Sequence, residues 1–161
     1  MLRGITVAAA VIGATPAMGG PSHCSPGESA VFSCSLGRKI VSLCASSDLS
    51  ENSGHLRYRF GRPGAAEFVY PAENVLAREA FVGGTIDARG GDFVRFSRGE
   101  FTYTVETAFD PRRGEVAGLK VHRGRKLVLD TTCRSDALGD EGWSRVYKAK
   151  PPRKLYHSVE D

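Results

Sequence analysis

The sequence predicts an all-β fold, a single small antiparallel β-barrel or sandwich of about eight short strands, linked by disulfides. Apolar and polar side chains alternate in short runs along the chain, which is typical of half-buried strands. Glycine supplies 19 of 161 residues and falls between these runs, where it suits tight turns. The cysteines number four, an even count that favours pairing in an exported protein.

Residues 1–19 have the layout of a cleavable secretory signal. A basic start at Arg3 is followed by an apolar stretch over 5–14 and then by small residues, with cleavage expected after Ala17 or Gly19. The apolar stretch is about half as long as the ~20 residues that a membrane-spanning helix needs. We therefore expect a periplasmic or secreted protein without a membrane span.

The rest of the chain divides into one domain and a tail. Residues 20–149 have ordinary apolar content and moderate charge, as expected for a single antiparallel β domain. Residues 150–161 contain two prolines and few apolar side chains, which predicts a loosely ordered C-terminal tail. The net charge of +4 favours anionic surfaces without indicating nucleic-acid binding.

The clearest hairpin joins residues 30–36 to 39–45 through Gly37-Arg38. Glycine at the first loop position suits a type II′ turn. A two-residue loop of this kind places two facing pairs on one side of the hairpin: Cys34 with Val41, and Phe32 with Leu43.

The central part of the chain predicts shorter elements. Residues 55–60 alternate apolar and polar side chains as in a half-buried strand, and 67–70 form a short strand before a proline. Residues 72–79 are helix formers, sufficient for one or two turns. The glycine-rich stretch 81–91 is expected to be a short strand or an exposed loop.

Two further hairpins follow. Residues 92–97 and 100–107 bracket Arg98-Gly99, and 115–122 and 126–133 bracket a loop expected to have three residues. The longer loop is favoured because it places two apolar pairs face to face: Val121 with Leu127, and Leu119 with Leu129.

The end of the domain combines a polar loop with a closing strand, expected over 143–148. The loop contains Asp136, Asp140 and Glu141, whose spacing does not match a calcium-binding EF-hand loop. We expect a solvated loop and no metal.

Four cysteines allow three pairings, and strand direction helps to choose among them. Cys34 shares a strand face with Phe32, and Cys133 shares one with Leu129, so both are expected to point into the core. Cys44 lies on the face opposite Leu43. These directions favour the disulfides Cys24–Cys44 and Cys34–Cys133. A zinc site is not expected, because the spacing lacks close C-x-x-C pairs.

The sequence contains no motif that indicates catalysis. There is no G-x-S-x-G nucleophile elbow and no H-E-x-x-H zinc motif, and the four histidines have no nearby carboxylate in a recognisable pattern. We therefore expect no enzyme activity and no cofactor.

Arginines are the main feature of the expected surface. Arg57, Arg59 and Arg62 are predicted to lie on one solvent-facing side, with Ser53 and Gly54 at its rim. Such a surface suits an anion: a lipopolysaccharide phosphate, a peptidoglycan carboxylate or an acidic protein face. Ordinary solubility and edge-strand protection are the alternative. The neighbouring aromatic rings point to the other face, which argues against a nucleic-acid site.

Two resemblances bear on function. The runs VFSCSLGRKIVSLC (31–44) and YRFGRPG (58–64), with FVRFSRGEFTYTV (93–105), resemble a group of small exported bacterial proteins of uncharacterised function, which implies a periplasmic or secreted setting. In layout the chain also resembles the β-barrel lysozyme inhibitors of bacterial envelopes, which insert a Ser-Gly loop into the lysozyme cleft. The run SGHLRY (53–58) is similar to that loop with one extra residue, and implies a lysozyme-like partner.

The leading hypothesis is an exported, non-catalytic binding protein of the envelope or extracellular space. Its partner is expected to be an anionic envelope component or a lysozyme-like protein. The alternatives are a periplasmic lysozyme inhibitor and a small hydrolase without a recognisable motif.

Overall fold

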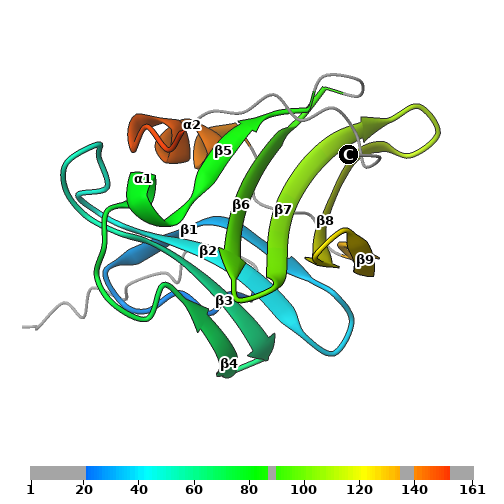
Figure 1. Ribbon diagram of the computed structural model, residues 1–161, viewed down its shortest axis with the longest axis horizontal. Helices are drawn as coiled ribbons and strands as arrows, with labels where there is room; N and C mark the ends of the chain where they lie inside the picture. The colour runs from blue at the N-terminus through cyan, green and yellow to red at the C-terminus, as the bar shows by residue number, and fades with distance from the viewer. Residues whose placement is uncertain (1–20, 87–89, 135–139, 153–161) are drawn as a thin grey trace, which may run out of the picture.

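The computed structural model describes residues 21–86, 90–134 and 140–152, without the side chains of Asp140 and Glu141. Two antiparallel sheets pack face to face with their strands running across each other (Figure 1). The first sheet consists of β1 (Glu28–Ser35), β2 (Ile40–Ser46), β3 (Leu56–Arg62) and β4 (Ala65–Tyr70). The second consists of β5 (Val82–Thr85), β6 (Asp92–Arg98), β7 (Phe101–Asp110), β8 (Gly114–Arg123) and β9 (Lys126–Thr132). The predicted all-β class is confirmed, as a sandwich.

The predicted signal over 1–19 and residues 153–161 of the predicted tail lie outside the described residues. Within the described part of the chain, no helix is long and apolar enough to cross a bilayer.

The first hairpin forms as predicted. Cys34 lies opposite Val41 and Phe32 lies opposite Leu43. The Leu36 N–H donates to the Lys39 carbonyl at 2.8 Å across the two-residue loop, and Gly37 takes a φ of 94° that other residues adopt at a cost.

Strand β2 is buried on both faces, which is unusual for an antiparallel sheet. Its inner side chains, among them Leu43, enter the core between the sheets. Its outer face is covered by the segment that precedes β1. There the His23 N–H donates to Ser42 Oγ at 3.1 Å, and Ser33 Oγ donates to the Pro21 carbonyl at 2.9 Å.

The core between the sheets is rich in aromatic rings. Phe96 of β6 is central: its ring stacks on Tyr103 at 4.9 Å between centroids and on Tyr70 at 4.1 Å. Tyr58 of β3 packs against the same ring at 4.9 Å. These contacts join β3 and β4 of one sheet to β6 and β7 of the other, and they place Tyr58 on the face opposite the β3 arginines, as expected.

The predicted closing strand over 143–148 is wrong, because these residues belong to helix α2 (Asp140–Lys148). Trp143 and Val146, three positions apart on one helix face, are buried in the core. Gly142 lies so close to β1 that an added Cβ would stand 1.8 Å from the Val31 carbonyl oxygen. The Tyr147 hydroxyl donates to the Gly84 carbonyl of β5 at 3.0 Å. The helix therefore spans the two sheets at one side of the sandwich (Figure 1).

The remaining elements follow the prediction more loosely. The helix expected over 72–79 is reduced to a single turn, α1 (Ala77–Ala80). The stretch predicted as a short strand or loop over 81–91 contains strand β5. The second hairpin forms where expected, with Arg98 opposite Phe101.

The predicted three-residue loop of the third hairpin is wrong. Arg123 lies opposite Lys126, so only Gly124-Arg125 forms the loop. A glycine at the first of two loop positions, here with a φ of 55°, again suits a type II′ turn.

The predicted apolar pairs of this hairpin are wrong as well. Leu127 lies opposite His122, and Leu129 lies opposite Val121, with an irregularity in the register between the two pairs. A bulge adds one residue to one strand and reverses the direction of the side chains that follow. The bulge therefore turns the Leu129 side chain to the inner face of the sheet. The sequence had predicted the same direction for Leu129, but from a longer loop rather than from a bulge.

Both predicted disulfides are confirmed. Cys24–Cys44, here named the N-terminal disulfide, holds the segment before β1 on the outer face of the first sheet. Cys34–Cys133, the long-range disulfide, joins β1 to the residue after β9 across a sequence separation of 99. The second bridge therefore ties one sheet to the other.

Candidate functional site

The predicted arginine surface does not form as one patch. Arg59 was expected to face solvent, and that expectation is wrong: its side chain is 8% exposed. Strand direction correctly places Arg59 on the outer face of the first sheet. The segment before β1 covers that face, however, and turns the arginine into a buried ion-pair partner.

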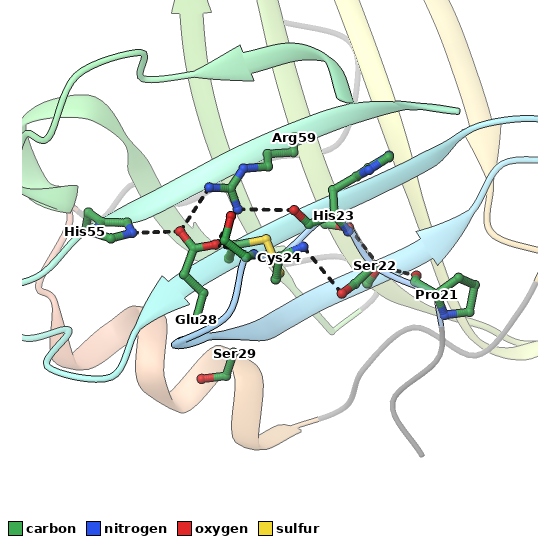
Figure 2. The surroundings of a disulfide bond; sticks show 12 residues. Pro21, Ser22, His23, Cys24, Glu28, Ser29, His55 and Arg59 are labelled. Atoms are coloured by element: carbon green, nitrogen blue, oxygen red, sulfur yellow. Dashed lines mark hydrogen bonds and ion pairs between the residues drawn. A yellow bond between two sulfur atoms is a disulfide. The ribbon is translucent and has the colours of Figure 1, made fainter. Parts of the chain in front are cut away.

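Figure 2 shows this network, which centres on the Glu28 carboxylate. Arg59 donates from Nη1 to Oε2 at 2.5 Å and from Nη2 to Oε1 at 3.0 Å, in the two-pronged arrangement typical of arginine and carboxylate. The His55 ring nitrogen Nε2 lies 2.8 Å from Oε1 of the same carboxylate. Arg59 also donates to the His23 carbonyl at 3.3 Å, so the network holds the leading segment in place.

The network lowers the pKa of Glu28. Burial by itself raises the pKa of this carboxyl, but hydrogen bonds from Arg59, His55 and the Ser25 N–H favour the charged form. Together with the positive charge of Arg59 they lower the pKa of Glu28 to about 2. The Glu28 carboxylate is therefore ionised at neutral pH, and the network acts as a structural clamp.

The other predicted binding residues lie apart. Ser53 donates from Oγ to the Asp48 carbonyl at 2.8 Å within its own loop, and Gly54 is packed against Ser46 and Leu49. Arg57 is half-buried and donates to Asn74 Oδ1.

Arg62 is exposed at the opposite end of β3, 4.0 Å from a Glu67 oxygen. A strand of this length separates it from Gly54 by roughly 25 Å. Of the five predicted binding residues, Arg62 and Ser53 face solvent, and they do so at opposite ends of β3.

A cleft of about 610 Å³ offers a better candidate site. We name it the arginine cleft, and it is lined by Ser35, Leu36, Gly37, Arg38, Lys39, Phe60, Leu129, Thr131 and Arg134. These residues come from the β1–β2 turn, from β3 and from β9 with the residues that follow it. The cleft volume lies within the roughly 300–1,000 Å³ typical of small-molecule sites.

The long-range disulfide positions one wall of this cleft. Its two neighbours in sequence, Ser35 and Arg134, both line the cleft, and the Arg134 N–H donates to the Ser35 carbonyl at 2.8 Å. The Arg134 guanidinium lies beside the turn, with Cζ 3.5 Å from where a Cβ on Gly37 would stand. Two chain segments about a hundred residues apart thus meet in a fixed arrangement.

The cleft carries an excess of positive charge. Lys39 Nζ is 2.6 Å from Glu67 Oε2 and lies 5.0 Å from the centre of the Phe60 ring, so it is already engaged. Its hydrogen bond to Glu67 lowers the pKa of that carboxyl. Arg38 and Arg134 are exposed, and no acidic side chain in the described part of the chain forms an ion pair with either. These two guanidinium groups are available to an anion.

The opposite wall of the cleft is apolar and partly open. Leu129 points to the inner face of the second sheet yet is 39% exposed, because the first sheet does not cover β9. Its neighbours Leu127 and Val128 are 38% and 46% exposed. Three large apolar side chains in a row are therefore accessible on the edge strand of the second sheet.

A second pocket of about 360 Å³ lies on the outer face of the second sheet. It contains an ion pair between Lys120 Nζ and Glu106 Oε1 at 2.5 Å, with side chains 8% and 13% exposed. Asp130 lies opposite Lys120 on the neighbouring strand. The charges here largely compensate one another, which leaves less for a ligand than in the arginine cleft.

Neither pocket has the groups of a recognisable catalytic site. No histidine is found among the described residues that line them. The described residues also contain no group of three or more His, Cys, Asp or Glu side chains suited to a metal ion. The solvated loop expected to contain Asp136, Asp140 and Glu141 is wrong for the last two, which begin helix α2, although their side chains are not described. Asp136 lies outside the described residues.

Sequence reasoning missed the arginine cleft because its lining comes from three separate segments. The one local signal was the cluster of Arg38 and Lys39 at a predicted turn, next to a cysteine expected to pair with Cys133. Residues next to paired cysteines must lie close together, and this places Ser35 beside Arg134. No family model, curated protein or solved structure matches the chain.

Proposed function

We propose that the chain is an exported, non-catalytic binding protein of the envelope or extracellular space, and that the arginine cleft binds an anionic group of its ligand. Export is supported by the signal-like layout of residues 1–19 and by two disulfides, which persist in oxidising compartments. The anionic ligand is supported by one observation above all: two exposed arginines without an ion-pair partner in the described chain line the same cleft.

Arginine suits this role better than lysine would. Its planar guanidinium presents parallel donors to a carboxylate or a phosphate, and it stays charged at any physiological pH. The backbone of Arg134 is already fixed by its hydrogen bond to Ser35, so only side-chain freedom is lost there when an anion binds. A phosphate of lipopolysaccharide and a carboxylate of a peptidoglycan fragment both fit this chemistry.

The test compares two surfaces on one protein. The oxidised protein is titrated with soluble peptidoglycan fragments and with lipopolysaccharide immobilised on a sensor chip. The double variant Arg38→Ala/Arg134→Ala removes the free charges of the cleft, while Arg57→Ala/Arg62→Ala removes charge from the surface predicted from sequence. Arg112→Ala/Lys148→Ala removes the same charge from exposed positions elsewhere.

We expect binding to at least one probe, weakened at least tenfold by the cleft variant and unchanged in the other two. Equal loss in the charge-matched control would show that only net charge matters. If only the Arg57→Ala/Arg62→Ala variant loses affinity for the probe, the binding site lies on β3 instead of in the cleft. Absence of binding to both probes would contradict the proposal, and inhibition of a lysozyme or turnover of a substrate would replace it.

A further inference from the structure

The arginine cleft joins two kinds of surface that a simple anion would not need. Its charged side is lined by Arg38, which follows Gly37 in the turn, and by Arg134, whose guanidinium lies beside Gly37. Its apolar side has Leu36 and Leu129. We infer that the ligand is a single-chain anionic amphiphile, an alkyl chain that ends in a carboxylate or phosphate. This inference rests on the proposed function and specifies the ligand class.

The charged end suits a head group with several oxygens. Both guanidinium groups are exposed, and Arg134 is held against the β1–β2 turn, with Cζ 3.5 Å from the Cβ position of Gly37. Lys39, the third cation of the cleft, is engaged by Glu67 at 2.6 Å and lies over Phe60. The head group can therefore pair with the two arginines, whereas Lys39 stays bound to Glu67 and only lines the cleft.

The apolar end suits an alkyl chain. Leu129 is 39% exposed inside the cleft, and its neighbour Val128, at the irregularity in the register, is 46% exposed. Leu127 lies opposite His122 and so belongs to the other face of the sheet. An alkyl chain that lies against this wall of the cleft would remove Leu129 and Val128 from water. Burial of such surface is the main source of affinity for an apolar ligand.

The form of β9 argues against a peptide as the occupant. A peptide that pairs with an edge strand needs a regular row of backbone donors and acceptors. The register of β9 is interrupted next to Val128, and bulges at sheet edges disfavour pairing with a further strand. An alkyl chain makes no hydrogen bonds, so the interrupted edge does not hinder it.

The test is a series of probes that share a head group. Inorganic phosphate, butyl, hexyl, octyl and decyl phosphate, decanoate and neutral decanol are titrated below their critical micelle concentrations by calorimetry. Full burial of a methylene gives about a fourfold gain in affinity, and an open cleft gives about half of that free energy. We therefore expect about a twofold gain per methylene from butyl to decyl phosphate, and no binding of decanol.

Two variants separate the ends of the ligand. Arg38→Ala/Arg134→Ala is expected to weaken decyl phosphate at least tenfold, and the charge-matched Arg112→Ala/Lys148→Ala is not. Leu129→Ser is expected to flatten the dependence on chain length and leave the affinity for inorganic phosphate unchanged. Amide shifts at Leu36, Gly37 and Thr131 locate the ligand, and the emission of the buried Trp143 reports that the fold is intact.

The outcomes distinguish this inference from the proposed function. If inorganic phosphate binds as tightly as decyl phosphate, the amphiphile is refuted and an anion site remains. Vesicles that contain phosphatidylglycerol are titrated alongside these probes. If they bind at the cleft and no soluble probe does, the ligand is a bilayer surface and the free amphiphile is refuted. If neither the vesicles nor any soluble phosphate or carboxylate probe binds there, both proposals fail.

Discussion

Replacement of Glu28 by glutamine is expected to remove a pH-dependent part of the stability. The pKa of Glu28 is lowered from 4.5 to about 2, a difference of about 2.5 pH units, and each unit corresponds to about 1.36 kcal/mol. The product is about 3.4 kcal/mol. His55, 22% exposed, leaves one side of the network partly open to solvent, so we expect about 2–3 kcal/mol in practice.

The sign follows from the direction of the shift. A carboxyl whose pKa is lower in the folded state contributes its full stability above pH 4.5 and loses that contribution as the pH falls toward 2. Urea unfolding of the wild type and Glu28→Gln is followed by Trp143 emission at several pH values between 7 and 2. The difference in unfolding free energy should be about 2–3 kcal/mol at pH 7 and close to zero at pH 2.

A difference that stays constant over this range would refute the electrostatic reasoning and indicate a steric effect of the substitution. Glu67→Gln serves as the control, because Glu67 is also paired but lies on the surface. Its difference from wild type should be far smaller and should vary little with pH.

Three further outcomes are expected. Gly142→Ala should lower the unfolding free energy by at least about 2 kcal/mol and shift Trp143 emission, because the new methyl group would stand 1.8 Å from a β1 carbonyl oxygen; unchanged values would contradict the docking of α2. Removal of the long-range disulfide should cost about 4.7 kcal/mol and removal of the N-terminal disulfide about 3.3, because they close loops of 99 and 20 residues; the reverse order in denaturant unfolding would contradict this reasoning. Excess protein should leave c-, g- and i-type lysozymes active in a cell-wall lysis assay, because Ser53 is engaged within its own loop; dose-dependent inhibition would contradict the prediction.

The sequence was most informative where turn chemistry and side-chain alternation agreed. The first hairpin follows from Gly37 and from the facing apolar pairs, and the direction of Cys34 within it led to the correct disulfides. The third hairpin shows the limit of this reasoning. For the apolar side chains of the two strands to face the same side, one residue more than a two-residue loop was needed between them. Alternation could not decide whether this extra residue lies in the loop or in a bulge at Val128.

Two other errors have a common cause in tertiary packing. Residues 143–148 were expected to form a closing strand, whereas the three-residue spacing of Trp143 and Val146 was the signal of a buried helix face. Arg59 was assigned to the correct face of its sheet, but local pattern does not reveal that another segment covers this face. The arginine cleft combines segments too distant for any local pattern to indicate it.

The separation of Cys34 and Cys44 by the first sheet has a consequence for oxidation during folding. Three thiols lie within the first part of the domain, and the native partner of one of them is made about a hundred residues later. Once β1 and β2 pair, Cys34 points to the interior and Cys44 to the opposite side, where it is bonded to Cys24 of the leading segment. A non-native disulfide between Cys34 and Cys44 would have to pass through the sheet. Early pairing of β1 and β2 therefore leaves the Cys34 thiol unpaired until Cys133, the last cysteine of the chain, is available.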